Sequence, residues 1–132
     1  MSLTIQNNKT NGIVVFNPLY GDNEIILDAA GADYPAGTVL GRITASGKLT
    51  KCDTAAVDGS QTPVAVLQDA QTFAAGVDTV AKPIISGQVR AAELVIYASG
   101  TPGAPTKAQL DQLRDFTIIG RATVDISQLD NQ

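Results

Sequence analysis

The chain has no histidine and no tryptophan, and a single cysteine, Cys52, among its 132 residues. Without histidine it lacks the commonest general base and the commonest zinc ligand, so Ser-His and Cys-His catalytic pairs are excluded. One cysteine forms no internal disulfide, so no oxidising compartment is needed and the cytoplasm is the natural place of synthesis. Because neighbours in a strand point to opposite faces, Lys51 does not activate Cys52, which we expect to be a passive apolar residue.

Long apolar runs and basic clusters are also missing. No segment reaches the roughly 18 apolar residues that a membrane-spanning helix needs, and the N-terminal sequence does not resemble a secretory signal, so no membrane partner is expected. The formal net charge is −4, from nine basic and thirteen acidic residues. Because phosphate binding depends on dense Lys and Arg clusters, nucleic acid is not an expected partner, and a protein partner is favoured.

What the sequence does contain is a series of short aliphatic runs separated by Gly and Pro. This spacing indicates one mainly β domain of the α+β class, with a small barrel-like or sandwich-like core. The clearest element is a hairpin within 34–53, in which strands at 38–44 and 49–52 flank a turn that contains Gly47. We expect further strands at 24–27, 64–67 (buried on both faces), 80–85 and 116–124, and loops at 28–33, 68–78 and 99–105.

One short helix is predicted near 107–115. Thr106 and Gln109 have the spacing of a capping box, and Leu110 and Leu113 place an apolar stripe on one side. In the strand that follows, Gly120 marks a bulge or a close approach of another segment. The run at 90–93 fits either a strand or a short helical turn.

Residues 1–12 are polar, with Leu3 and Ile5 as the only large apolar side chains after Met1. Alone, such a segment does not bury enough surface to offset its ordering entropy of about 1–2 kcal/mol per residue. It is either a frayed terminus or an arm that becomes ordered against a partner. The short β-prone run at 13–16, closed by Asn17-Pro18, slightly favours the arm.

No constellation of reactive groups emerges from the remaining residues. Two groups of acidic residues (Asp22, Glu24 and Asp28; Asp53 and Asp58) do not match a calcium loop, and we expect them to be solvated. The glycines before the predicted helix are interrupted by two prolines, which removes amide donors from a candidate anion site. We therefore expect no catalytic residue, metal or cofactor, and no enzymatic activity.

Several segments of the chain resemble the lambda-type bacteriophage head decoration proteins. The resemblance rests on P-A-G-T-V-L-G-R-I-T-A-S-G-K-L at 35–49 and G-S-Q-T-P-V-A-V-L at 59–67. It continues with I-I-S-G-Q-V-R-A-A-E-L at 84–94 and with the capped helix followed by F-T-I-I-G-R-A, and it spans about 24–124.

The resemblance implies a homotrimer that binds the major capsid protein on the outer surface of the mature, expanded capsid, at threefold or quasi-threefold sites. It also implies a β-rich decoration domain, here 20–132, after an arm at 1–19 that is flexible when the protein is free. We expect this arm to add a strand to the shell, with Leu3, Ile5, Ile13, Val15 and Phe16 as anchors. The alternative is a secreted or virion β domain that recognises a host-surface glycan, for which the three tyrosines are few and scattered.

Overall fold

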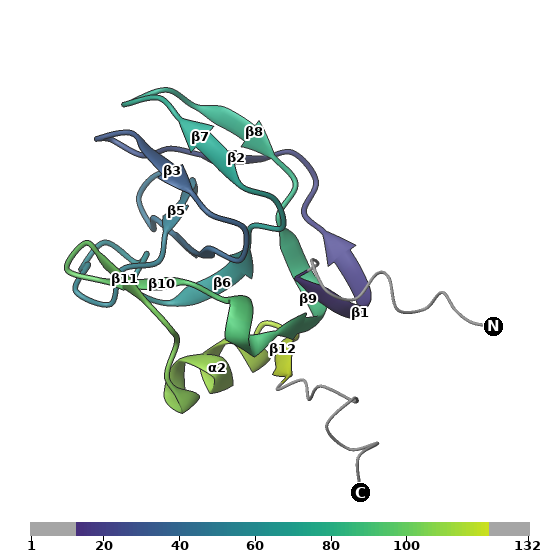
Figure 1. The fold of residues 1–132 in the computed structure, drawn as a ribbon. Coiled ribbons are helices and arrows are strands. Elements are labelled where there is room, and N and C mark those ends of the chain that lie inside the picture. Colours follow the sequence, from purple (N-terminus) through teal and green to yellow (C-terminus); the bar gives the residue numbers. More distant parts are fainter. Residues whose placement is uncertain (1–12, 122–132) are drawn as a thin grey trace, which may run out of the picture.

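The structure is a computed structural model that describes residues 13–121. Within this range the chain forms twelve strands, one α-helix and one 3-10 helix (Figure 1). The strands are β1 (Val14–Tyr20), β2 (Glu24–Ile26), β3 (Ala32–Tyr34), β4 (Val39–Arg42), β5 (Leu49–Lys51), β6 (Pro63–Val66), β7 (Gln71–Phe73), β8 (Thr79–Ala81), β9 (Ile84–Arg90), β10 (Ile96–Ala98), β11 (Thr101–Gly103) and β12 (Ile118–Arg121). The helices are η1 (Ala91–Glu93) and α2 (Lys107–Arg114). The expectation of a β-rich domain with one short α-helix is confirmed.

Eight of the strands form one curled sheet that resembles half a barrel (Figure 1). Its order is β1-β9-β6-β4-β5-β2-β8, and β12 pairs in parallel with β9. Two-stranded sheets, β3-β7 and β10-β11, complete the fold. One side of β9 carries β1, and its other side is shared between β6 at Ile84 and β12 at 87–90.

The predicted hairpin lies in the middle of the large sheet. β4 pairs with β5 on one side and with β6 on the other, and Gly47 in the turn has φ of +75°. Glycine adopts this left-handed conformation without the Cβ clash that other residues meet. The sequence prediction of a hairpin here is confirmed.

Two apolar clusters lie on opposite faces of β4 and β6. Val39 and Val66 belong to one cluster, whereas their neighbours Leu40 and Ala65 belong to the other. Successive side chains of a strand point to opposite faces, so these two central strands are buried on both sides. The first cluster comprises Ile13, Val39, Cys52, Val66, Ile84, Val89, Leu94, Ile96, Leu113 and Ile118. The second comprises Ile26, Tyr34, Leu40, Leu49, Ala65, Leu67 and Phe73.

Helix α2 begins at the predicted capping box. The Thr106 hydroxyl accepts from the Gln109 amide at 3.3 Å, and the Gln109 side chain accepts from the Thr106 amide at 2.7 Å. Leu113 is fully buried against the first cluster. A Cβ on Gly120 would lie 2.9 Å from Leu110 Cδ2, so glycine allows α2 to approach β12 closely. The prediction of a close approach at Gly120 is confirmed.

Several local predictions were wrong. β3 begins inside the expected 28–33 loop, β7 lies inside the expected 68–78 loop, and β11 lies inside the expected 99–105 loop. The expected strand at 80–85 is divided between β8 and β9, which are separated at Pro83. Of the two alternatives left open at 90–93, the helical turn is confirmed, as η1 (Ala91–Glu93).

Candidate functional site

Three of the predicted arm anchors lie in the part of the chain that the structure describes. Ile13 is 4% exposed and belongs to the first apolar cluster, so any contact between Ile13 and a partner would require it to leave the core. Val15 is 39% exposed. For Phe16 only the backbone is described, and it pairs with Gln88 of β9. Leu3 and Ile5 lie outside the described residues.

Strand β1 lies at one edge of the large sheet. It pairs antiparallel with β9, from Val14 opposite Val89 to Tyr20 opposite Ile84, and no other strand within 13–121 pairs with it. Its second row of backbone groups is therefore not used by any strand in this range. Such an edge is a template for pairing with another chain.

The strand continues through Asn17-Pro18, which the sequence had indicated as its end. Proline does not donate a ladder hydrogen bond, and it is accommodated in edge strands because one row of amides there needs no partner. The pairing with β9 shifts register on both sides of this dipeptide. β1 is therefore an irregular edge strand and extends to Tyr20.

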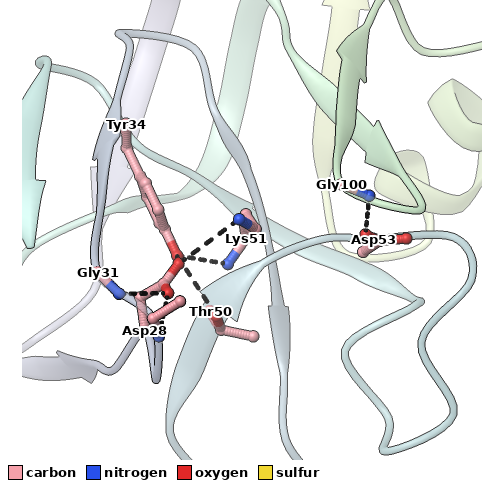
Figure 2. A network of polar contacts seen from close by, with 8 residues as sticks. Asp28, Gly31, Tyr34, Thr50, Lys51, Asp53 and Gly100 are labelled. Atoms are coloured by element: carbon pink, nitrogen blue, oxygen red, sulfur yellow. Dashed lines mark hydrogen bonds and ion pairs between the residues drawn. The ribbon is translucent and has the colours of Figure 1, made fainter. Parts of the chain in front are cut away.

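A buried polar network was the main feature that the sequence did not predict (Figure 2). The Tyr34 hydroxyl donates to Asp28 Oδ2 at 2.6 Å, and it accepts from the Lys51 backbone amide at 3.2 Å. The other Asp28 oxygen accepts from the amides of Ala30 and Gly31 at 3.0 and 2.9 Å. These bonds fasten the loop before β3 to β5.

The charge of Asp28 is stabilised by its partners. Burial alone would raise its pKa, but the Tyr34 hydroxyl, the Ala30 and Gly31 amides and the Lys51 ammonium 3.7 Å away together lower the pKa. Burial and the bond to Asp28 raise the pKa of Tyr34. The carboxylate is therefore ionised and the phenol neutral at pH 7. The expectation that Asp28 is solvated was wrong; the signal for it was the Asp28-x-x-Gly31 spacing of a side-chain-capped turn.

Asp53, which lies just after β5, has a similar structural role. Its two oxygens accept from the backbone amides of Ser99 and Gly100 at 2.8 and 2.7 Å, and Oδ1 also accepts from Ala55. Figure 2 shows the bond to Gly100. Slight burial raises its pKa, but these three amides outweigh that effect and lower the pKa. Asp53 thus joins the loop after β5 to the β10-β11 turn.

Cys52 is fully buried in the first apolar cluster. Burial, with a smaller contribution from the nearby charge of Asp53, raises the pKa of the thiol to about 12. A protonated, inaccessible thiol is not a nucleophile at neutral pH. The expectation of a passive apolar residue agrees with this environment.

The described residues do not gather into a metal centre. No group of three or more His, Cys, Asp or Glu side chains within 13–121 is arranged to hold a metal ion. In the same range no helix is long and apolar enough to cross a bilayer. A hollow of about 420 Å³ beside β3 and β7 is lined by Asp33, Tyr34, Pro35, Ala70, Gln71 and Thr72. Tyr34 and Tyr97 are buried, so two of the three tyrosines are not on the surface for stacking against a sugar.

Comparison with known families identifies the class directly: the family model described as bacteriophage lambda head decoration protein D matches residues 6–118. The chain therefore belongs to the family of the bacteriophage lambda head decoration protein D. It is a structural protein of the phage head that decorates the capsid. The curated proteins and the solved structures gave no match.

Proposed function

We propose that this protein binds the outside of the mature, expanded capsid as a homotrimer at threefold or quasi-threefold sites. There it would hold neighbouring major capsid proteins together against the pressure of the packaged DNA. The observation that carries the proposal is the family match over 6–118. The protein would be made in the host cytoplasm and would join the virion after the shell expands.

The proposed contact with the shell is made by the N-terminal arm. Leu3, Ile5, Val15 and Phe16 would supply apolar contacts, while main-chain groups add a strand to an exposed edge of the capsid protein. Ile13, which is buried, would fasten the base of the arm to the domain core. The open edge of β1 supports this mechanism, because the second part of the arm belongs to that strand and residues 1–12 precede it in the sequence.

Stabilisation of the shell follows from mass action. A ligand that binds the assembled lattice, and not its separated subunits, contributes RT ln(1 + [L]/Kd) for each site, about 2.7 kcal/mol at a hundredfold excess over Kd. Three arms on one trimer engage at high effective concentration after the first has bound. A stable trimer should bury more than about 1,000 Å² at each subunit interface.

Co-sedimentation with purified shells tests the proposal. The protein should pellet with expanded shells and should stay in the supernatant with immature shells. Deletion of residues 1–12 should abolish the binding and leave the domain folded, as judged by circular dichroism. Equal binding to both kinds of shell, or full binding after the deletion, would contradict the mechanism. Analytical ultracentrifugation of free and shell-released protein tests the trimer.

A further inference from the structure

The loop between β5 and β6 contains Asp58-Gly59, the only Asp-Gly dipeptide in the sequence, and this pair is chemically labile. The amide nitrogen that follows an aspartate attacks the side-chain carboxyl carbon most readily when the next residue is glycine, because no side chain hinders the approach. An N–C bond forms while the carboxyl hydroxyl leaves with the amide proton as water, and a five-membered succinimide results. Water then opens the ring at either carbonyl. One opening returns aspartate, and the other gives isoaspartate, in which the main chain runs through the side-chain carboxyl.

Packing in this loop requires the glycine. Gly59 has φ of +105°, and a Cβ there would lie 2.8 Å from the Arg42 carbonyl oxygen and would clash with the Thr44 hydroxyl. Glycine meets both constraints because it has no Cβ. The Asp58 carbonyl accepts from the Thr44 amide at 2.9 Å. The labile pair is therefore part of the contact between this loop and the segment that follows β4.

Hydrogen bonds hold both reacting groups of the pair to other partners. The Gly59 amide donates to the Gln61 side-chain oxygen at 2.8 Å, and an amide oxygen is too weak a base to remove the proton. Asp58 Oδ1 accepts from the amide and the hydroxyl of Ser60, a buried residue, at 3.0 and 2.6 Å. Attack requires a narrow alignment of the carboxyl carbon with the nitrogen and the loss of the N–H proton. Bonds that hold the two groups elsewhere therefore oppose the reaction.

The bonds from Ser60 also keep the carboxyl in its less reactive charge state. The Ser60 hydroxyl and then the Ser60 amide lower the pKa of Asp58, and together they outweigh the slight burial that would raise it. Succinimide formation expels a carboxyl oxygen as water, so it proceeds more easily from the protonated acid than from the carboxylate. The lowered pKa reduces the protonated fraction at neutral pH and slows the reaction further.

We propose that Asp58-Gly59 is a latent isoaspartate site that the folded loop keeps closed, with Gln61 and Ser60 as the residues that close it. The inference does not depend on how the protein binds the capsid. Isoaspartate would add one methylene to the main chain where Gly59 packs closely against Arg42 and Thr44, so it would disrupt that contact. A protein of the phage head has no repair enzyme beside it once the particle has left the host, so the protection has to come from the fold.

Peptide mapping of incubated protein tests whether the fold closes the site. The full chain is kept at neutral pH for several weeks, either folded or unfolded in urea, and electron-transfer fragmentation then locates isoaspartate residue by residue. This resolution is needed because the Asn11-Gly12 pair of the sequence also yields isoaspartate, by deamidation. Because the reaction needs an opened loop, we expect isoaspartate at Asp58 to form at least tenfold faster in the unfolded chain than in the folded protein. Similar rates in the two states would overturn the inference.

A matched pair of variants tests the role of Gln61. Gln61→Leu removes the acceptor for the Gly59 amide with little change in size, and Gln112→Leu is the control, because it makes the same substitution at an exposed position of α2. In the folded state we expect isoaspartate to form at Asp58 at least threefold faster in Gln61→Leu than in the unmodified protein, and within twofold of it in the control. All three chains should react equally fast in urea.

Urea midpoints of the same variants separate this local effect from a general loss of stability. If Gln61→Leu does not accelerate the reaction, or accelerates it only as much as its unfolded fraction rises, Gln61 does not close the site and the proposal is overturned. Acceleration at an unchanged midpoint supports it, because the loop then opens while the rest of the domain stays folded.

Discussion

Replacing Tyr34 by phenylalanine removes one buried hydroxyl and keeps the ring that packs against Phe73, 4.7 Å away between centroids. That hydroxyl donates to Asp28 and accepts from the Lys51 amide. A hydrogen bond to a charged group contributes about 1.5–3 kcal/mol, and a buried polar group left without its partner costs about 1–3 kcal/mol. Because the two losses overlap, we expect Tyr34→Phe to lower the free energy of unfolding by about 2–4 kcal/mol at pH 7.

The effect should depend on pH, because it depends on the charge of Asp28. The pKa of Asp28 is lowered in the folded protein. Its ionised form therefore stabilises the fold at pH values above the unfolded pKa of about 3.9, and this contribution is lost as the pH falls through the lower folded-state pKa. The difference between the unmodified protein and Tyr34→Phe should be full at pH 7 and should shrink as the pH falls below the unfolded pKa of about 3.9.

Urea unfolding at fixed protein concentration, followed by circular dichroism, measures this difference. With a slope of about 2 kcal/mol per molar urea, the midpoint should fall by about 1–2 M at pH 7. Tyr20→Phe is the matched control, because Tyr20 is exposed, and it should change the free energy of unfolding by less than about 0.5 kcal/mol. A midpoint for Tyr34→Phe equal to that of the control, or a loss that is the same at pH 7 and at acidic pH, would refute the reasoning.

Three further predictions concern tight packing, the helix cap and the thiol. Gly41→Ala should lower the free energy of unfolding by more than about 4 kcal/mol in thermal melts, because the new Cβ would lie 2.1 Å from the Ser60 carbonyl oxygen. Gly103→Ala, with no atom within 4 Å of the new Cβ, should change it by less than about 0.5 kcal/mol, and equal effects would contradict the packing argument. Thr106→Ala should cost about 1 kcal/mol by loss of the cap, with Thr106→Ser restoring most of it in the same melts. Cys52 should resist a thiol reagent at pH 8 until urea unfolds the chain, and rapid labelling of the native protein would disprove its burial.

Sequence reasoning succeeded where a structure depends on residues close together in the chain. The turn at Gly47 and the cap formed by Thr106 and Gln109 are local, so their residue types suffice to predict them. Sequence reasoning failed for β3 and β7. Each strand has three residues, and they pair with each other, Ala32 opposite Phe73, although a long segment separates them in the sequence. Strands this short carry no periodicity of their own, and distant pairing determines them.

The exposure of the apolar side chains on β1, β9 and β12 was predictable only in part. Val15 was expected to face a partner from the arm sequence, and it is exposed. Ile85 and Ile119 each stand next to an equally apolar, fully buried isoleucine, so composition does not reveal which of the two faces solvent. That choice is set by the register of β9 against β1 and β12, a property of the folded sheet.

The burial of β4 on both faces determines how the domain should unfold when heated. Val39 and Leu40 each anchor a different apolar cluster through one continuous stretch of backbone, so neither half of the molecule keeps its packing once that strand separates. We therefore expect the domain to unfold in a single cooperative step, without a populated, partly unfolded intermediate. Under the proposed function, a capsid covered by such molecules would keep its added stability up to a threshold temperature and lose it abruptly beyond that temperature.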